Sequence, residues 1–274
     1  MNRKEFQQWC YLELPKLTEC MEHSCTAIDL QGNVVFESKG ENLFHQIQKR
    51  KIYVVDSQQP WRQIARTHKD WSVVLGVTVF NEKRQVAEME SLVDPTLESE
   101  TDNLFALTPN DSDASRLTIE LHRMDRKFCI VYKMEIASDW WKSLENRNTD
   151  VKRTVLNLLG FPTAQSLPKP SDLNEVRNRL TEFVNSKKQS CPLDWDLCSK
   201  VSVICYAIEL ARNRKLQTEF FKPKYHNVFG DVVVLQNALF LNADILTGDK
   251  PLKRMASYVG KQCVDLRPRG ELAN

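Results

Sequence analysis

The chain has 274 residues, of which 42% are hydrophobic and 27% charged, and its formal net charge is +2. This length suits one large or two ordinary domains, and the composition is ordinary for a globular protein. The longest apolar stretch, Val73–Phe80, is too short to span a bilayer, and the first residues lack the apolar segment of a secretory signal. We therefore expect a cytoplasmic protein without a membrane partner. So small a net charge neither demands nor excludes a nucleic-acid partner.

The cysteines are not spaced like a disulfide framework. Three of them recur every seven residues, at Cys191, Cys198 and Cys205. On a helix this spacing puts them on one face, which favours small buried residues. The cluster of Cys20, His23 and Cys25 lacks a second pair at zinc-site spacing, so we do not expect zinc there.

The N-terminal part, which we bound at 1–86, predicts alternating helices and strands. In chain order the periodicity predicts a helix over 3–22, a hairpin of strands 26–30 and 34–36, a helix over 41–50, a strand over 51–56, a helix after Pro60 and a strand over 71–80. The strand over 51–56 ends in an acid, Asp56. That acid is either a ligand at the end of a strand or the cap of the following turn.

The hairpin has charged ends. Asp29 stands before its turn, and Glu37 and Lys39 stand at its far end. This spacing resembles the PD-(D/E)xK nuclease signature, in which the acids bind metal and the lysine assists the attacking water. The resemblance implies a nuclease site of Asp29, Glu37 and Lys39. Charged ends are also common on hairpins that have no such role.

Residues 87–149 predict an acidic insertion. Between residues 88 and 113 there are eight acids and no Lys or Arg, with Pro95 and Pro109 and no periodicity. This stretch is typical of a loop. A second hairpin is predicted from 117–121 and 128–132. Trp140 and Trp141 follow, as core residues or as platforms for a stacked base.

The part over 150–274 is mainly helical. Its helix over 197–214 is apolar on several faces, which predicts burial, yet it contains Glu209. A buried carboxylate must be paired or bound to a metal. From 250 to 274 there are six bases and two acids, a net charge of +4 that suits a phosphate backbone or a solvated basic face.

The most informative stretch runs from Phe229 to Asp249. Asp231 opens an apolar run of helical spacing, Asn242 is a candidate left-handed C-cap, and a short strand over 243–246 leads to Asp249. Ligands bind beyond the carboxyl ends of strands in open α/β sheets, so we expect Asp231 and Asp249 to meet there. Close carboxylates repel unless a cation neutralises them, and oxygen ligands suit Mg²⁺ or Mn²⁺.

This pattern resembles the C-terminal half of the PIN-domain nucleases, the family of the VapC toxins. The separation of Asp231 from Asp249, Thr247 two residues before the second acid, and the helix through Met255 and Tyr258 carry the resemblance. It implies a three-layer α/β/α fold with a mainly parallel central sheet, here extended by an N-terminal hairpin and an insertion. The alternative is an unrelated N-terminal α/β domain in front of a degenerate PIN-like half.

The resemblance also implies further acids. Asp56-Ser57-Gln58 is similar to the end of the family's first strand, with Gln where Asn is usual. Glu209 is similar to the family's helical acid, with Glu82 as a rival, and Asp244 is an additional candidate ligand. His226 is the histidine that lies near Asp231 in the sequence.

The function that follows is a metal-dependent ribonuclease. Its expected catalytic acids are Asp56, Glu209, Asp231 and Asp249, with Mg²⁺ or Mn²⁺ held by Asp56, Asp231 and Asp249. Its expected RNA-binding residues are Thr247, Lys250, Lys253 and Arg254. The competing function is a non-catalytic PIN-like scaffold that binds RNA or protein, and a homodimer or a regulatory protein partner is a further expectation.

Overall fold

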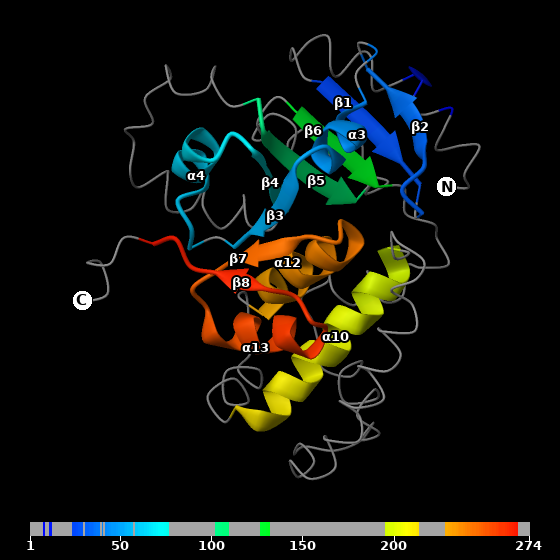
Figure 1. Ribbon diagram of the computed structural model, residues 1–274. Helices are drawn as coiled ribbons and strands as arrows, with labels where there is room; N and C mark the ends of the chain where they lie inside the picture. Colours follow the sequence, from blue (N-terminus) through cyan, green and yellow to red (C-terminus); the bar gives the residue numbers. More distant parts are fainter. Residues whose placement is uncertain are drawn as a thin grey trace, which may run out of the picture.

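The central feature of the fold is one mainly parallel sheet (Figure 1). The computed structural model describes residues 8, 11–12, 24–29, 31–38, 40, 42–56, 58–76, 102–109, 127–131, 195–213 and 228–267. Within these ranges eight strands form a sheet in the order β2-β1-β6-β5-β4-β3-β7-β8, and every neighbouring pair except β1 and β2 is parallel. The expected α/β class with a mainly parallel sheet is therefore confirmed.

The elements alternate along the chain as the periodicity predicts. The strands are β1 (Ser24–Ile28), β2 (Val34–Glu37), β3 (Lys51–Val55), β4 (Trp71–Gly76), β5 (Leu104–Pro109), β6 (Lys127–Val131), β7 (Asp244–Leu246) and β8 (Cys263–Val264). The described helices are α3 (Leu43–Gln48), α4 (Trp61–Thr67), α10 (Trp195–Arg212), α12 (Val228–Phe240) and α13 (Lys250–Tyr258).

The middle of the sheet is built from β-branched residues. Val54 on β3 lies between Val74 on β4 and Ile245 on β7, and all three are fully buried. Strands of a parallel sheet are covered on both faces, which is why Ile52–Val55 of β3 and Val73–Leu75 of β4 are apolar without polar alternation. The core is thus centred on the strands that carry Asp56 and Asp249 at their ends.

The order of the strands reverses beside β3. From β3 the chain continues to β4 and β5 on one side, whereas β7 and β8 are added on its other side. The carboxyl ends of β3 and β7 are level, because Val55 is in register with Leu246. Such a reversal is the place where open α/β sheets bind ligands.

The N-terminal hairpin forms as expected. β1 and β2 are antiparallel, with Ala27 opposite Phe36. Asp29 is buried and closes the turn, because its carboxylate accepts the backbone N–H of Gln31 and Asn33 at 3.0 and 2.8 Å. Asn33 also donates its side-chain amide to Asp29 at 3.0 Å. Asp29 thus stabilises a turn, and Glu37 lies exposed on β2.

The region expected as a peripheral insertion supplies two inner strands. β5 pairs with β4, β6 pairs with β5 and with β1, and all three pairings are parallel. The expectation of loop over 104–109 is therefore wrong, whereas the strand expected at 128–132 is confirmed as β6. Both edges of β6 are paired with β1 and β5, and the expected partner over 117–121 lies outside the described residues. The apolar run at Leu104–Leu107 is short and has acidic flanks, so composition concealed a strand whose Phe105 is fully buried.

The C-terminal helices agree closely with the sequence. α10 is buried as expected, and its Cys198 and Cys205 are fully buried free thiols. Burial raises the pKa of the Cys205 thiol. Asn242 ends α12 with a left-handed φ of 51°, which confirms the expected cap. α12 begins at Val228, three residues before Asp231, so Asp231 lies in its first turn.

Several expectations fall outside the described residues. These are most of the helix over 3–22, Cys20, His23, Lys39, Ser57, Glu82, the strand over 117–121, Trp140, Trp141, Cys191 and His226. The expected boundaries between the three parts of the chain, at residues 86 and 149, stay predictions. No helix in the described ranges is long and apolar enough to cross a membrane.

Candidate active site

The carboxyl ends of β3 and β7 are joined through Thr247. The backbone N–H of Asp56 donates to Leu246 across the two strands at 2.9 Å. The hydroxyl of Thr247 donates to Oδ2 of Asp56 at 2.6 Å and accepts the backbone N–H of Asp249 at 2.9 Å. Thr247 is fully buried and Asp56 nearly so. One hydroxyl therefore links the side chain of Asp56 to the backbone of Asp249, two residues that are 193 positions apart in the chain.

Asp249 also begins the next helix. It is the N-cap of α13, and its Oδ1 accepts the backbone N–H of Leu252 at 3.0 Å. Pro251 stands in the first turn, where a missing N–H costs nothing. The cap thus fixes the orientation of Asp249, and the side chain keeps partial exposure at the edge of the sheet.

Asp231 approaches the same edge from α12. A Cβ atom on Gly76, at the end of β4, would lie 3.6 Å from Val233 and 2.6 Å from the Asn237 amide. Leu75 is in register with Val55, so the next residues, Gly76 and Asp56, lie at the same height along the sheet. The part of α12 between Val233 and Asn237 therefore lies at this height too. α12 leads through a short turn into β7 and so runs against it. Asp231 therefore lies toward the carboxyl ends of the strands.

These acids do not form a closed metal cage. In the ranges that the structure describes, no group of three or more His, Cys, Asp or Glu side chains is arranged to hold a metal ion. The chemistry of the acids at this edge nevertheless fits a hard divalent cation, since Asp56, Asp231 and Asp249 offer carboxylate oxygens. Two of them, Asp56 and Asp249, are held together by Thr247.

Glu209 is engaged within the protein. Its side chain is 1% exposed, and its Oε1 accepts a hydrogen bond from Nε of Arg254 at 2.7 Å and forms an ion pair with the same guanidinium. The Tyr258 hydroxyl donates to Oε2 at 3.1 Å. This hydrogen bond to Glu209 raises the pKa of the Arg254 guanidinium, and the charges of Glu209 and Asp249 contribute. The contacts thus tie α10 to α13.

Arg254 belongs to the same contact between α10 and α13. We expected Arg254 to contact the RNA backbone, but its guanidinium is paired with Glu209, and its side chain is half-exposed. Lys250 is exposed in the first turn of α13, and Lys253 lies one turn further on. Lys253 Nζ lies 3.8 Å from Oδ2 of Asp265. Lys250 and Lys253 therefore lie on the helix that Asp249 begins, whereas the Arg254 guanidinium on the same helix is engaged with Glu209 on α10.

Asp265 is an acid of this edge that sequence reasoning missed. It directly follows β8, as Asp56 follows β3. Its Oδ1 accepts from the amide of the fully buried Gln59 at 3.0 Å, and Arg267 donates to both of its oxygens at 3.0 and 2.8 Å. Hydrogen bonding by Arg267 holds the pKa of the Asp265 carboxyl well below its usual range. Its position directly after a strand could have marked Asp265 as a candidate, because Asp56 is a candidate for the same reason.

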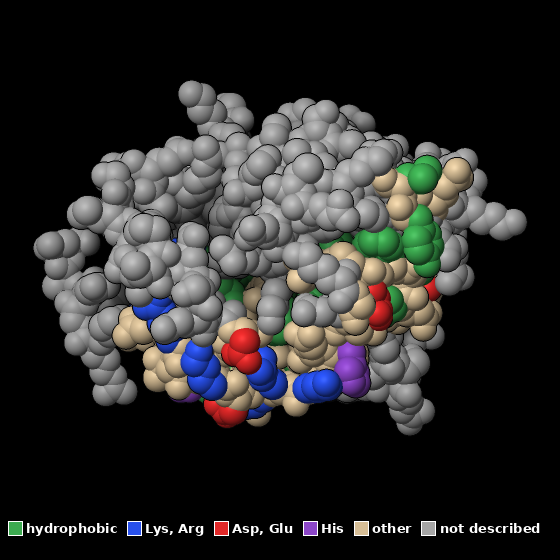
Figure 2. Space-filling view, turned by 90° about the horizontal axis from the view of Figure 1, so that it is seen from above, with side chains coloured by type: hydrophobic (Ala, Val, Ile, Leu, Met, Phe, Trp, Pro, Cys, Tyr) green, Lys and Arg blue, Asp and Glu red, His purple; other side chains and the backbone are tan. Residues whose placement is uncertain are grey.

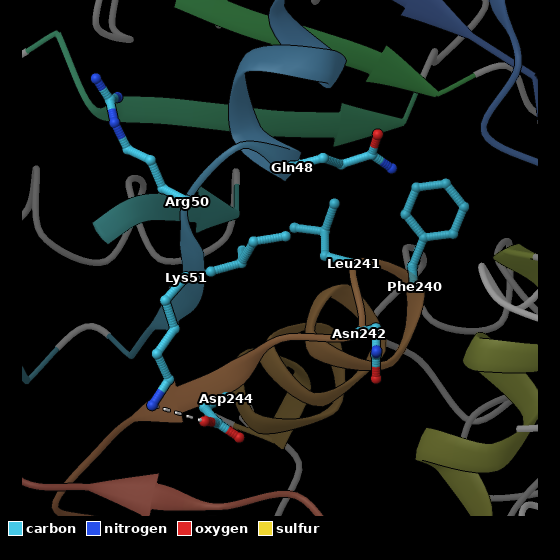
Figure 3. A pocket seen from close by; sticks show the side chains of 8 residues that line it. Gln48, Arg50, Lys51, Phe240, Leu241, Asn242 and Asp244 are labelled. Carbon is cyan, nitrogen blue, oxygen red and sulfur yellow. Dashed lines mark ion pairs between the residues drawn. The ribbon is translucent and has the colours of Figure 1, made fainter. Parts of the chain in front are cut away.

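A cavity lies at the opposite ends of the same strands (Figure 3). Its volume is about 470 Å³, and it is lined by Gln48, Arg50, Lys51, Ile52, Phe240, Leu241, Asn242 and Asp244. Lys51 Nζ lies 3.5 Å from Asp244, and Arg50 points the other way, toward Asp102 at 2.8 Å. Asp244 thus stands at the amino end of β7, away from Asp249. It does not belong with the acids at the carboxyl ends.

The view from above shows the charges on one face of the described surface (Figure 2). Lys and Arg side chains lie along one margin, with acidic and His side chains among them. Signs that alternate in this way do not make a uniformly basic surface for a phosphate backbone. This face therefore offers no clearer RNA-binding surface than the carboxyl edge.

Comparisons with protein-family models, with curated proteins and with solved structures found no match. The interpretation of the site accordingly depends on its geometry and chemistry.

Proposed function

We propose that this protein is a metal-dependent ribonuclease whose site lies at the carboxyl ends of β3 and β7. The observation that carries the proposal is the Thr247 hydroxyl, which joins Asp56 to Asp249 where the strand order reverses. Ligand sites of open α/β sheets form at such reversals. The strand order and the helices are compatible with the three-layer PIN-like fold that the sequence resembles.

Asp56, Asp231 and Asp249 would hold Mg²⁺ or Mn²⁺. Such an ion supplies a water of lowered pKa and stabilises negative charge on the phosphate. The hydrogen bond from Thr247 holds the Asp56 carboxylate in a fixed orientation. The hydrogen bond from the backbone N–H of Leu252 does the same for Asp249.

The remaining expected residues divide into two groups. Lys250 and Lys253 follow Asp249 on α13 and would meet the RNA backbone. Glu209 and Arg254 form the joint between α10 and α13, and we assign them the positioning of α13 and hence of Asp249. We therefore propose Glu209 as a positioning residue and not as a catalytic acid.

The experiment is cleavage of single-stranded RNA with Mg²⁺ or Mn²⁺ by wild type, Asp56→Asn and Asp249→Asn. Each substitution removes one charged oxygen ligand at nearly constant size, so we expect cleavage to fall by about 100-fold or more. Asp244→Asn is the matched control at the other end of β7, and its activity should equal that of wild type. Equal activity in all four proteins would refute the site.

A non-catalytic RNA- or protein-binding scaffold is the second candidate. Two observations favour it: the described residues offer no group of three ligands, and Glu209 is taken up by Arg254. The two functions differ in metal binding. Calorimetric titration with Mn²⁺ should give a binding isotherm for wild type that Asp249→Asn weakens. The scaffold would show neither binding nor cleavage.

A further inference from the structure

Arg267 is a cation fixed beside the candidate acids. Its Nε and Nη2 donate to the two oxygens of Asp265, and its Nη1 donates to Gln58 at 3.0 Å. The hydrogen bond to Asp265 raises the pKa of the Arg267 guanidinium, and the charges of Asp56 and Asp249 contribute to that shift. Arg267 therefore lies within electrostatic reach of both acids that share Thr247.

Asp265 and Gln58 hold this side chain in a defined place. Gln59 anchors Asp265 from the other side, since its amide donates to Asp265 at 3.0 Å and its carbonyl oxygen accepts the backbone N–H of Leu266 at 3.0 Å. Arg267 is 27% exposed. A guanidinium has five N–H groups, and three of them donate to the part of the chain that the structure describes. As far as the described residues go, two N–H groups are left for a ligand.

Gly248 makes room for this arrangement. It stands between Thr247 and Asp249, and a Cβ atom added to it would overlap the Arg267 guanidinium. The overlap involves three atoms of the guanidinium, so any larger residue must displace the whole group. The absence of a side chain at 248 therefore allows Arg267 to lie directly against the turn that carries Asp249.

We propose that Arg267 binds the phosphate of the RNA substrate beside Asp56 and Asp249, with Asp265 and Gln58 as its positioning residues. The inference rests on the proposed ribonuclease function and adds a substrate-binding residue to it. A fixed guanidinium suits this role because its planar fork matches phosphate geometry and loses little freedom on binding. The cation also offsets the three carboxylates that would otherwise repel a phosphate.

The test measures RNA binding without cleavage. Full-length protein is titrated into labelled single-stranded RNA with Ca²⁺ in place of Mg²⁺, over a series of salt concentrations. For Arg267→Gln we expect about tenfold weaker binding. We also expect the slope of log affinity against log salt to become shallower by about 0.7, the share of one phosphate contact in a single strand.

Two further variants distinguish a direct contact of Arg267 with phosphate from a purely structural role of Arg267. Gly248→Ala changes no charge but displaces the guanidinium, so it should lower RNA affinity as Arg267→Gln does. Arg267→Lys keeps the charge and loses the fork, so it should retain the salt slope with weaker binding. Arg50→Gln is the matched control, because Arg50 is paired with Asp102 at the amino ends of the strands.

The outcomes decide between the proposals. Unchanged affinity for Arg267→Gln, or lower affinity with an unchanged salt slope, would overturn the role of Arg267. Tighter Mn²⁺ binding by Arg267→Gln with unaltered RNA affinity would also overturn it, and would make Arg267 a counter-ion of the acids. Arg267-dependent RNA binding without any cleavage would support the phosphate contact while the proposed ribonuclease fails.

Discussion

The two ends of β3 and β7 hold their acidic residues in different ways. At the amino ends, Lys51 pairs with Asp244 and Arg50 with Asp102, and both pairs are substantially exposed. At the carboxyl ends, Asp56 and Thr247 are buried and joined by a hydrogen bond, and Asp249 donates its N–H to the same hydroxyl. Charges are thus matched one to one at the amino ends, whereas at the carboxyl ends a buried hydroxyl links the Asp56 carboxylate to the backbone of Asp249.

The difference shows which end of the sheet depends on an exact arrangement of side chains. Exposed ion pairs are screened by water and contribute little, so the amino ends need no exact geometry. A nearly buried carboxylate requires fixed donors, because its desolvation is costly. The carboxyl ends are therefore the part of the sheet whose structure depends on particular side chains, and substitutions there should have larger effects.

Glu209→Ala should have the largest effect on stability. It removes a buried carboxylate and leaves Arg254 and Tyr258 without their shared acceptor, so the free energy of unfolding should fall by about 3 kcal/mol. Urea denaturation measures the change. If Glu209 were dispensable to the joint between α10 and α13, the midpoint would shift no more than that of a surface variant.

Thr247→Val should have the second-largest effect on stability. The change keeps the shape and removes the hydroxyl that donates to Asp56, so the free energy of unfolding should fall by about 2 kcal/mol. The same denaturation experiment on Thr67→Val provides the control, because the Thr67 hydroxyl donates to Gln63 at an exposed position. Equal losses in the two variants would remove the distinction between the ends of the sheet.

Asp265→Asn should give a smaller effect that depends on pH. Arg267 lowers the pKa of the folded Asp265 carboxyl, so its contribution is present above the ordinary value of about 3.9 and is lost as the pH falls below it. The stability gap between wild type and variant should therefore be widest near neutral pH and close in acid. Chemical denaturation across this range measures it, and a gap that widens on acidification would contradict the pairing.

Lys51→Met should have the smallest effect. Its ion pair with Asp244 is exposed and screened by water, so the free energy of unfolding should hardly change. The melting temperature at low and high salt is the readout. A large loss that salt abolishes would mean that the amino ends are as finely arranged as the carboxyl ends.

Local patterns in the sequence predicted most of the elements around the site. The apolar runs at 51–55 and 71–76, the spacing along α12 and the left-handed cap at Asn242 all depend on near neighbours in the chain. The strands β5 and β6 were not recognised as part of the sheet, because a short apolar run reveals its place only when its partners are known.

Local sequence patterns specify the alternation of strands and helices, and they mark Asp56, Asp231 and Asp249 as acids at the ends of these elements. Contacts between distant segments appear only in the folded chain. The fold joins Asp56 to Asp249 through Thr247, pairs Glu209 with Arg254, and lays Arg267 on Gly248. Hydrophobic periodicity is local and can be read along the chain, whereas hydrogen bonds and close packing between distant segments exist only once the strand order brings them together.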